Sequence, residues 1–354
     1  MRNSRLCACA LGILALMGIL TGCNRENGNE NEIAPMNVKE AEGTKESSSV
    51  LDEPIIIPHA FGETVIETRP ERIVTISWGN SDVPLALKEV PVGVSKANFG
   101  KMSEKGLHPW TEKAFASLGV EDPVVFDDTD GLDFEAISNA KPDVILAAYS
   151  GITQEEYDLL SQIAPVVAYP RLPWQTYWRE QTLLDAKGMG KEIEAEKLIE
   201  KTEALMAEKM LKYKDVQDKT VAFLYFNPSN LGMFYVYLPA DPRVAYLEDL
   251  GLKFPESVLE LARNESNFSV NISAENADIL KDADIIVTYG DESVLKVLQE
   301  DKLIRKIPAV ANGSVALLND DSELAAASTP TILSIPATID EYLNLLNEAA
   351  KKVK

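Results

Sequence analysis

Cysteine and histidine are scarce in this sequence, which has three cysteines and two histidines among 354 residues. Cys7 and Cys9 lie in an N-terminal segment that we expect to be removed, which leaves Cys23 in the mature chain. A single cysteine excludes an internal disulfide bond and a cysteine-based metal site. His59 and His108 have no second histidine, cysteine or helix-spaced carboxylate close by in the sequence. We therefore expect no directly bound zinc or manganese ion and no cofactor.

Positive charge is also in short supply, because 34 Lys and Arg stand against 56 Asp and Glu and give a formal net charge of −22. Phosphate binding requires clustered Lys and Arg, so we expect no nucleic-acid partner. The sequence lacks the G-x-S-x-G, P-loop and dinucleotide-binding motifs, which argues against the enzymes that use them. An acidic cluster at Asp127, Asp128, Asp130 and Asp133 lacks the glycine and the final glutamate of a calcium loop, so we expect a solvated loop there.

The N-terminus has the pattern of a targeting segment. Arg2 and Arg5 precede an apolar run over residues 6–20, which is short for a membrane-spanning helix. The run ends in small residues followed by Cys23, which is typical of a bacterial lipoprotein signal. We expect residues 1–22 to be the signal peptide and Cys23 to carry lipid. The alternative is an ordinary secretory peptide followed by a chance cysteine.

The segment after this cysteine is rich in Asn, Glu, Ser and Gly and nearly free of aromatic and branched residues. Such a composition cannot bury enough apolar surface to fold, so residues 23–54 are expected to form a lipidated, flexible tether. About 30 residues of this kind span roughly 30 Å. The folded part is then expected outside the cytoplasm, anchored to the cell membrane and able to reach a membrane partner.

Short branched runs alternate with helical patterns along the rest of the chain. Strands are expected at 55–57, 64–66, 72–76, 90–94, 144–148, 165–170, 220–225, 284–289 and 315–318. Helices are expected at 82–87, 133–138 with Asp133 as cap, 154–163, 243–250, 273–280 with Ser273 as cap, 293–299 and 335–350. Residues 98–110 are expected to form a loop.

The two halves of this pattern resemble each other. FEAISNAKPDVILAAYSG in the first half matches AENADILKDADIIVTYGD in the second, with a helix that leads through an Asp into a strand. Strands that alternate with helices predict mainly parallel sheets, so we expect an α/β fold with two Rossmann-like lobes at 55–190 and 214–354. A ligand is expected between the lobes, beyond the carboxyl ends of the strands.

One long amphipathic helix is expected at 191–213 as the connection between the lobes. Its apolar residues, among them Ala195, Ile199 and Met206, recur at spacings of three, four and seven. At 1.5 Å per residue it would be roughly 35 Å long. The alternative is an ordinary surface helix within one domain. A single stiff helix should permit only a small lobe rotation when ligand binds.

Aromatic and arginine residues gather at the expected strand ends and in the loops that follow. Together they would suit a cleft for a bulky, partly polar ligand, because aromatic rings offer apolar contact area and arginine holds anionic oxygens. The alternative for each is a place in the core. The candidate ligand-binding residues are Trp78, Trp110, Tyr149, Arg171, Trp174, Trp178, Tyr225, Tyr235, Tyr237, Arg243 and Tyr289.

A family resemblance covers the chain from about Pro54 to its end. The segments GETVIETRPERIVTI, LDFEAISNAKPDVILAAYSG, LSQIAPVVAY, YLEDLGL, ISAENADILKDADIIV and LIRKIPAVANGSVALL occur in one order. Together with ALKEVPVGV, they resemble the iron-siderophore and cobalamin class of substrate-binding lipoproteins of ABC importers. The family's usual LG before the PVG motif is here Leu87-Lys88-Glu89. The resemblance implies two α/β lobes joined by one long helix, with a ferric chelate or corrinoid bound between them.

The resemblance also implies partners for this protein. A Glu at the start of the matching helix in each lobe, here Glu135 and Glu275, would pair with Arg residues of the membrane permease. The alternative for both is a favourable interaction with the helix dipole. We expect a monomer.

The expected ligand is a ferric siderophore, whose own oxygens hold the iron. Haem or cobalamin is the alternative within the class, with His59, His108, a Tyr or a Met as axial ligand, and a lipoprotein esterase or phosphatase is a further alternative. An anionic catecholate complex would require several cations, and beyond Arg171 and Arg243 there are only Lys96 and Lys101. The aromatic excess favours a neutral hydroxamate complex.

Overall fold

The computed structural model describes residues 50–263 and 266–354, which belong to one compact unit. The signal peptide expected at 1–22 and the lipid expected on Cys23 lie outside the described residues. The expected tether lies outside them too, except at its end, because the first strand already begins at Val50. Within the described part of the chain, no helix has both the length and the apolar content that crossing a membrane requires.

An antiparallel hairpin opens the described chain, with strands β1 (Val50–His59) and β2 (Gly62–Thr68). The Thr64 hydroxyl donates to the carbonyl of Val166 at 2.6 Å, and the amide of Ala60 donates to the carbonyl of Tyr169. These bonds fix the hairpin to one edge of the first sheet. The two strands expected around His59 are confirmed, and His59 itself is buried and bonded to Thr64.

The first sheet has five parallel strands in the order β5-β4-β3-β6-β7. They are β3 (Ile73–Thr75), β4 (Gly93–Ser95), β5 (Val125–Phe126), β6 (Val144–Ala147) and β7 (Val166–Ala168). The helices of this half are α1 (Asp82–Ala86), α2 (Pro109–Ser117), α3 (Phe134–Asn139), α4 (Gln154–Leu160) and α5 (Trp178–Gly188).

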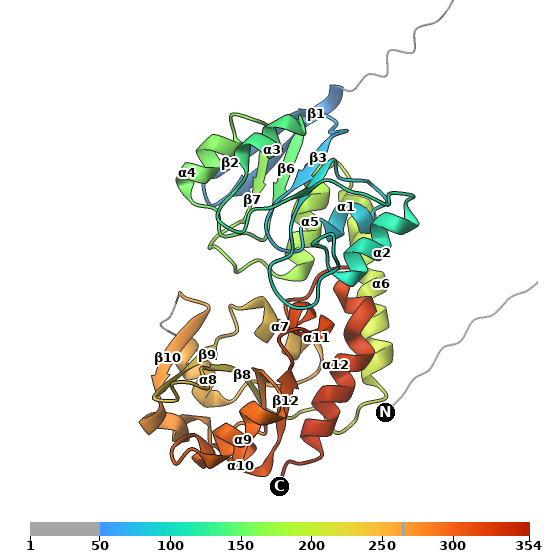
Figure 1. Cartoon of the computed structure of the whole chain (residues 1–354). Helices are drawn as coiled ribbons and strands as arrows, with labels where there is room; N and C mark the ends of the chain where they lie inside the picture. Colours follow the sequence, from blue (N-terminus) through green and yellow to red (C-terminus); the bar gives the residue numbers. More distant parts are fainter. Residues whose placement is uncertain (1–49, 264–265) are drawn as a thin grey trace, which may run out of the picture. The chain divides into compact units, whose positions relative to one another are not determined.

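Both faces of this sheet are covered, as a parallel sheet requires. Alternate strand residues point to opposite sides, so Val144 packs in one cluster with α1 and α5 while Ile145 packs in another with α3 and α4. Figure 1 shows these helix pairs on opposite sides of the sheet. Asp133 caps α3 as predicted, because its carboxylate accepts from the amide of Ala136 at 2.9 Å. We call the first sheet with α1–α5 the first lobe.

Two helices of the first lobe differ from the sequence-based expectation. Helix α2 begins at Pro109, inside the segment expected to be loop, with proline at a position where a helix tolerates its missing N–H. Helix α5 was not expected, because its sequence WREQTLLDAKG has few strongly apolar residues and shows no clear helical stripe.

The second sheet is mixed, with the order β10-β9-β8-β11-β12. Its strands are β8 (Val221–Phe226), β9 (Met233–Tyr237), β10 (Ser269–Ser273), β11 (Ile285–Tyr289) and β12 (Val315–Leu318). β8, β11 and β12 are parallel, whereas β8, β9 and β10 are antiparallel. The expectation of mainly parallel sheets is therefore correct for the first sheet and wrong for half of the second. The reason is local, since β8 and β9 are joined by a short turn instead of a crossover helix.

The helices around the second sheet form, with that sheet, the second lobe. They are α7 (Pro242–Asp249), α8 (Glu256–Ala262), α9 (Glu292–Glu300), α10 (Pro308–Asn312), α11 (Glu323–Ala327) and α12 (Ser334–Ala350), with 3₁₀ helices η1 (Ala274–Leu280) and η2 (Ile304–Lys306). The helix expected at 273–280 is thus 3₁₀, and its backbone is irregular at Asn276. The predicted capping bond from the Ser273 side chain is absent.

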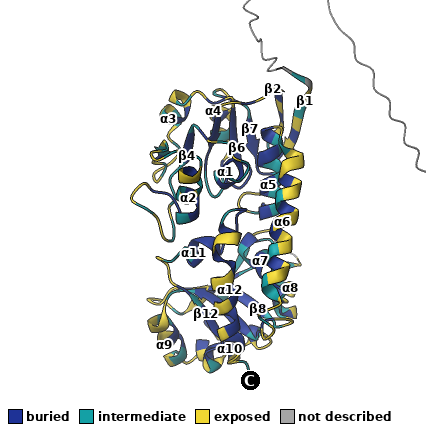
Figure 2. Ribbon diagram, turned by 90° about the vertical axis from the view of Figure 1, so that its right-hand side faces the viewer, coloured by how far each residue is buried: buried dark blue, intermediate teal, exposed yellow. Residues whose placement is uncertain are grey.

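Helix α6 (Glu192–Met210) lies between the two sheets in the sequence and is shorter than the expected 191–213. Its buried residues, Ala195, Ile199, Thr202 and Met206, form the predicted stripe. The helix contacts α5 of the first lobe and α12 of the second. Figures 1 and 2 show it running beside α12 along both lobes.

The largest apolar cluster is continuous between the lobes. It includes Val144 and Trp178 from the first lobe, Ile199 of α6, and Phe223 and Tyr342 from the second. Because α5, α6 and α12 share this core, one side of the molecule is closed by packed side chains. A cavity lies between the carboxyl ends of the two sheets.

Candidate functional site

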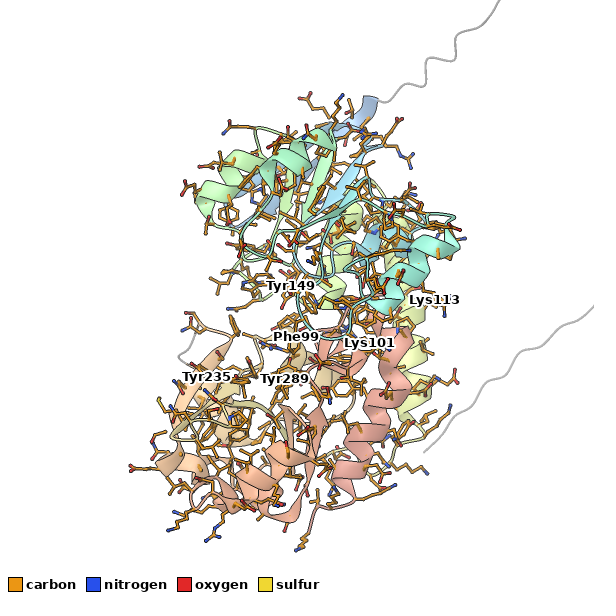
Figure 3. All side chains as sticks on the ribbon, in the orientation of Figure 1. Phe99, Lys101, Lys113, Tyr149, Tyr235 and Tyr289 are labelled. Carbon is orange, nitrogen blue, oxygen red and sulfur yellow. The ribbon has the colours of Figure 1, made fainter. Side chains whose placement is uncertain are left out.

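A cavity of about 660 Å³ lies where the strands of the two sheets end. The first lobe lines it with the loops after β3, β4 and β6, and the second lobe with residues of β8, β9 and β11 and of the segment before α12. The carboxyl ends of parallel strands meet at one edge of a sheet, which explains why residues far apart in the sequence gather here. Figure 3 shows Tyr149 on the first lobe facing Tyr289 on the second, with Phe99 between them.

Eight of the eleven candidate ligand-binding residues line this cavity. They are Trp78, Trp110, Tyr149, Trp174, Tyr225, Tyr237, Arg243 and Tyr289. Tyr149 and Trp174 meet edge to face with ring centroids 5.3 Å apart. Trp174 is held in a left-handed backbone conformation, with φ of 60°, by a bond from its amide to the carbonyl of Ser150. An aromatic side chain in this conformation costs about 1–3 kcal/mol, so the fold maintains its position against strain.

Three candidates lie outside the cavity. Arg171 forms a two-fold ion pair with Glu180, with both N–O distances 2.8 Å. Trp178 is the first residue of α5 and is 2% exposed, and its indole N–H donates to Asp249 at 2.9 Å. Tyr235 is 43% exposed on β9, beside Tyr225.

Sequence reasoning missed several residues of the cavity. Phe99 and Phe268 contribute aromatic rings, and Phe99 meets Tyr289 edge to face at 5.2 Å. Both follow or border expected loops, so their position is a usable signal, but neither is a Trp, Tyr or Arg. Asp82 and Thr331 also line the cavity. They are 249 residues apart, and no local pattern relates them.

Arg243 is the partly buried cation of the site, with its side chain 17% exposed. Its guanidinium binds both carboxylate oxygens of Asp241, at 2.8 and 2.6 Å, and donates to the Tyr289 hydroxyl at 3.3 Å. It also lies over the ring of Tyr237, 3.9 Å from its centroid. Burial acts to lower the pKa of Arg243, but the charge and hydrogen bonds of Asp241 outweigh it and hold this pKa well above its usual value. The cation is therefore permanent and already paired.

Asp82 joins the two lobes at the cavity wall. Its carboxylate, 1% exposed, accepts hydrogen bonds from the indole of Trp110 at 2.8 Å and from the hydroxyls of Thr111 at 2.7 Å and Thr331 at 2.5 Å. Burial raises the pKa of the Asp82 carboxyl to about 6, although the three hydrogen bonds act to lower it. His108 stacks on Trp110 with centroids 4.7 Å apart, which places one aromatic platform beside this carboxyl.

Negative side chains outnumber positive ones around the cavity. Among the described residues that line it, the cations are Lys96, which pairs with Asp127 at 2.9 Å, and Arg243. The lining carboxylates are those of Asp82, Asp128, Glu156, Asp241 and Asp320. Lys101 points elsewhere and pairs with Glu323 at 2.9 Å. An anionic ligand would therefore find no unpaired cation among these residues.

Two residues of the acidic cluster at residues 127–133 are paired with side chains close by. Asp127 pairs with Lys96 and bonds to Thr129, and Asp128 accepts from the hydroxyl of Ser95 at 2.5 Å. Burial raises the pKa of Asp128. In residues 50–263 and 266–354, no group of three or more His, Cys, Asp or Glu is placed to hold a metal ion.

Glu135 and Glu275 occupy matching positions in the two lobes. Each is exposed in the first turn of a helix, α3 or η1, which leads into β6 or β11. β6 and β11 hold the same place in the two sheet orders. The repeated sequence pattern therefore corresponds to a repeated structural position on the surface.

Comparisons with known proteins agree with this architecture. The family described as "Periplasmic binding protein" matches residues 73–322. The structure of PiaA from Streptococcus pneumoniae TIGR4 in complex with ferrichrome is 51% identical, with a TM-score of 0.82 over 85% of this chain and 100% of that one. SirA of Staphylococcus aureus, complexed with staphyloferrin B, is 26% identical with a TM-score of 0.63, over 82% of this chain and 98% of that one. The Fe(3+) dicitrate-binding periplasmic protein FecB of Escherichia coli (strain K12) is 24% identical over 76% of this chain and 86% of its own length.

Proposed function

Because this chain belongs to the periplasmic binding protein family, we propose that it is an extracytoplasmic solute-binding protein that captures a ferric siderophore and delivers it to an ABC importer for iron uptake. The observation that carries the proposal is the aromatic cavity of about 660 Å³ between the two lobes. Such a cavity suits a ligand that brings its iron already coordinated, because aromatic rings contact the organic shell while the siderophore's oxygens hold the metal. The family is one of solute-binding proteins, and we propose no catalytic reaction for this chain.

The charge of the cavity supports an uncharged iron complex. Five lining carboxylates face two cations that are each paired within the protein. An anionic ferric catecholate would lose its hydration without gaining an unpaired cation, which is unfavourable in a partly buried site. A ferric trihydroxamate is neutral and avoids this cost. The 51% identical PiaA structure is a complex with ferrichrome.

A binding panel tests both parts of the proposal. The probes are a ferric trihydroxamate, its iron-free form, a ferric catecholate, ferric citrate, haem and cobalamin. Three of the four tryptophans line the cavity, so quenching of tryptophan fluorescence reports binding directly. At 100 times its Kd, a ligand should raise the free energy of unfolding by about 2.7 kcal/mol.

We expect the ferric trihydroxamate to bind most tightly and the anionic complexes at least tenfold less tightly. A preference for catecholate would refute the charge argument alone. If none of the iron complexes binds, the siderophore function is wrong, and a response to haem or cobalamin would replace it with the alternative of the same class.

We also propose that Glu135 and Glu275 contact the permease. Their matching exposed positions on the two lobes support this. The test is iron-siderophore uptake by cells that carry Glu135→Ala with Glu275→Ala. A matched control is Glu155→Ala with Glu292→Ala, since both of these residues are exposed in the first turns of α4 and α9. Any loss of helix-dipole stabilisation is common to both double variants.

We expect the first pair of substitutions to abolish uptake with unchanged ligand affinity and the control pair to leave uptake intact. Equal uptake by the two double variants would contradict docking through these glutamates.

We further propose that lipid on Cys23 anchors the protein to the cell membrane. The support is the sequence pattern of a basic start, an apolar run and small residues before this cysteine. Replacing Cys23 by Ala should move the protein from the membrane fraction to the soluble fraction and abolish its labelling by fatty acid. Labelling that persists in the variant would contradict this anchor.

A further inference from the structure

An aromatic row on the second sheet continues past the wall of the cavity. In the antiparallel pair of β8 and β9, Tyr225 lies opposite Tyr235, and their ring centroids are 6.1 Å apart. Side chains two residues apart share a face, so Tyr235 and Met233 follow Tyr237 along the same side of β9. Tyr225 and Tyr237 line the cavity, whereas Tyr235 and Met233 do not.

Exposure rises in steps along this row. Phe223 is fully buried and contacts Tyr237, whose ring lies beneath the Arg243 guanidinium. The next pair, Tyr225 and Tyr235, is 39% and 43% exposed, and Met233 beyond it is 48% exposed. Two residues of a strand advance the chain by about 7 Å, so Tyr235 and Met233 lie about 7 and 14 Å along β9 from Tyr237. In Figure 3, Tyr235 lies on the second lobe, farther from α6 and α12 than Tyr289.

The strands that carry and border this row are uncharged. The three strands β8, β9 and β10, all within the described chain, contain no Asp, Glu, Lys or Arg. The neighbour of Tyr235 on β10 is Asn271, whose side-chain amide donates to the sulfur of Met233 at 3.8 Å. Across the cavity mouth, the loop with Trp174 approaches the segment before β10, because the Gln175 side chain donates to the carbonyl of Ser266 at 2.9 Å.

We propose that Tyr225, Tyr235 and Met233, which we call the outer ladder, form a second subsite for the part of a siderophore that extends away from its iron-binding groups. The inference rests on the proposed function and adds the chemistry of that extension, which is apolar or aromatic, uncharged and about 7–14 Å long. The occupant follows from continuity, since the ladder begins at Tyr225 inside the cavity and continues outward on the same strands. Exposed aromatic and Met side chains that adjoin a ligand cavity gain contact area when such a group lies on them.

Two chelates of equal charge test whether this subsite contributes to affinity in addition to the cavity. Both are linear ferric trihydroxamates with an acylated terminal amine, one bearing an acetyl group and the other a naphthoyl group on a spacer of about 7–14 Å. We expect the naphthoyl chelate to bind the unaltered protein more tightly than the acetyl chelate. Tyr235→Ala should reduce that preference by about 2- to 12-fold, the factor that 0.5–1.5 kcal/mol of aromatic contact represents.

Two further variants make the result specific to the ring of Tyr235. Tyr235→Phe keeps the ring and should keep the preference. Val65→Ala truncates a strand residue on the hairpin that is 42% exposed, almost as much as Tyr235, and it should leave the preference unchanged.

The outcomes distinguish the subsite from the function. The first outcome is that the acetyl chelate binds but the naphthoyl group adds no affinity, and the second is that the gain in affinity from the naphthoyl group persists in Tyr235→Ala. In either case the outer ladder is not a ligand subsite, and the siderophore function stands. If uptake falls in Tyr235→Ala while both affinities are unchanged, the ladder contacts the permease instead and the inference is overturned. If neither chelate nor any cyclic ferric trihydroxamate binds, the proposed function itself fails.

Discussion

Replacing Asp82 by Asn should change how the stability of this protein depends on pH. Two of the partners of Asp82 donate to one carboxylate oxygen, and the Thr111 hydroxyl donates to the other. Asn can keep its oxygen toward Trp110 and Thr331 and turn its amide toward Thr111, whose hydroxyl can accept as well as donate. The substitution therefore removes a buried charge while it leaves each partner a bond.

The magnitude follows from the pKa of this carboxyl. Burial raises it from 3.8 to about 6 in the folded protein, against the three hydrogen bonds. Between about pH 4 and pH 6 the unfolded chain releases this proton while the folded chain retains it, so the free energy of unfolding falls as pH rises. A difference of about two pH units corresponds to about 3 kcal/mol. Asn has no such proton, so the stability of the variant relative to the unaltered protein should rise by this amount over the same range.

Urea denaturation of both proteins at about pH 4, 5, 6 and 7, followed by tryptophan fluorescence, measures this difference. The pKa of His108, beside Trp110, is lowered by burial, but His108 is present in both proteins and largely cancels in the comparison. A control is Asp291→Asn, because hydrogen bonds from Ser293 lower the pKa of that exposed carboxyl. That carboxyl titrates below about pH 4 in both the folded and the unfolded chain, so the relative stability of this variant should stay nearly constant from pH 4 to pH 7. A stability difference for Asp82→Asn that stays constant from pH 4 to pH 7 would refute the reasoning.

Three further results are expected from other parts of the structure. Asp241→Asn leaves the partly buried Arg243 without its ion partner and should cost about 3–5 kcal/mol in urea denaturation, whereas Glu180→Gln breaks a more exposed pair and should cost about 0–1 kcal/mol. Gly100→Ala should destabilise more than Gly119→Ala, because both have positive φ but only the first places a methyl group 2.6 Å from a side chain of α11. Solution scattering with and without a bound ferric trihydroxamate should show a small compaction, since a continuous core joins the lobes, and a large one would contradict that role of α5, α6 and α12.

Hydrophobic patterning predicted most of the buried parallel strands and several of the helices next to them, because short branched runs alternate there with helical stripes. It missed β9 and β10, and for β9 the reason is physical. In the segment Met233–Tyr237, exposed and buried residues alternate, but the exposed positions are themselves Met and Tyr. The sequence therefore lacks the polar alternation that marks a half-exposed strand. It missed β5 because two residues carry no period.

Residue type and strand order were enough to predict part of the site. Trp78 and Tyr149 follow predicted strands and line the cavity. Arg171 is of the same residue type as Arg243, which lines the cavity, but it pairs with Glu180 in the first turn of an unexpected helix. The contact of Asp82 with Thr331 depends on how the lobes meet, and a pattern read over a few residues carries no information about a partner 249 residues away.

The mixed order of the second sheet has a consequence for how ligand preference can change during evolution. On the first lobe, most of the lining residues sit on loops after parallel strands, so replacing one of these can alter the path of its loop. On β9, the backbone is fixed between two paired neighbours, and every second side chain faces the ligand side. Single substitutions at Tyr237, or at Tyr235 and Met233 of the proposed outer ladder, can therefore alter this side of the sheet without moving its backbone. The antiparallel half of the sheet gives this protein a rigid wall on which ligand preference can vary one side chain at a time.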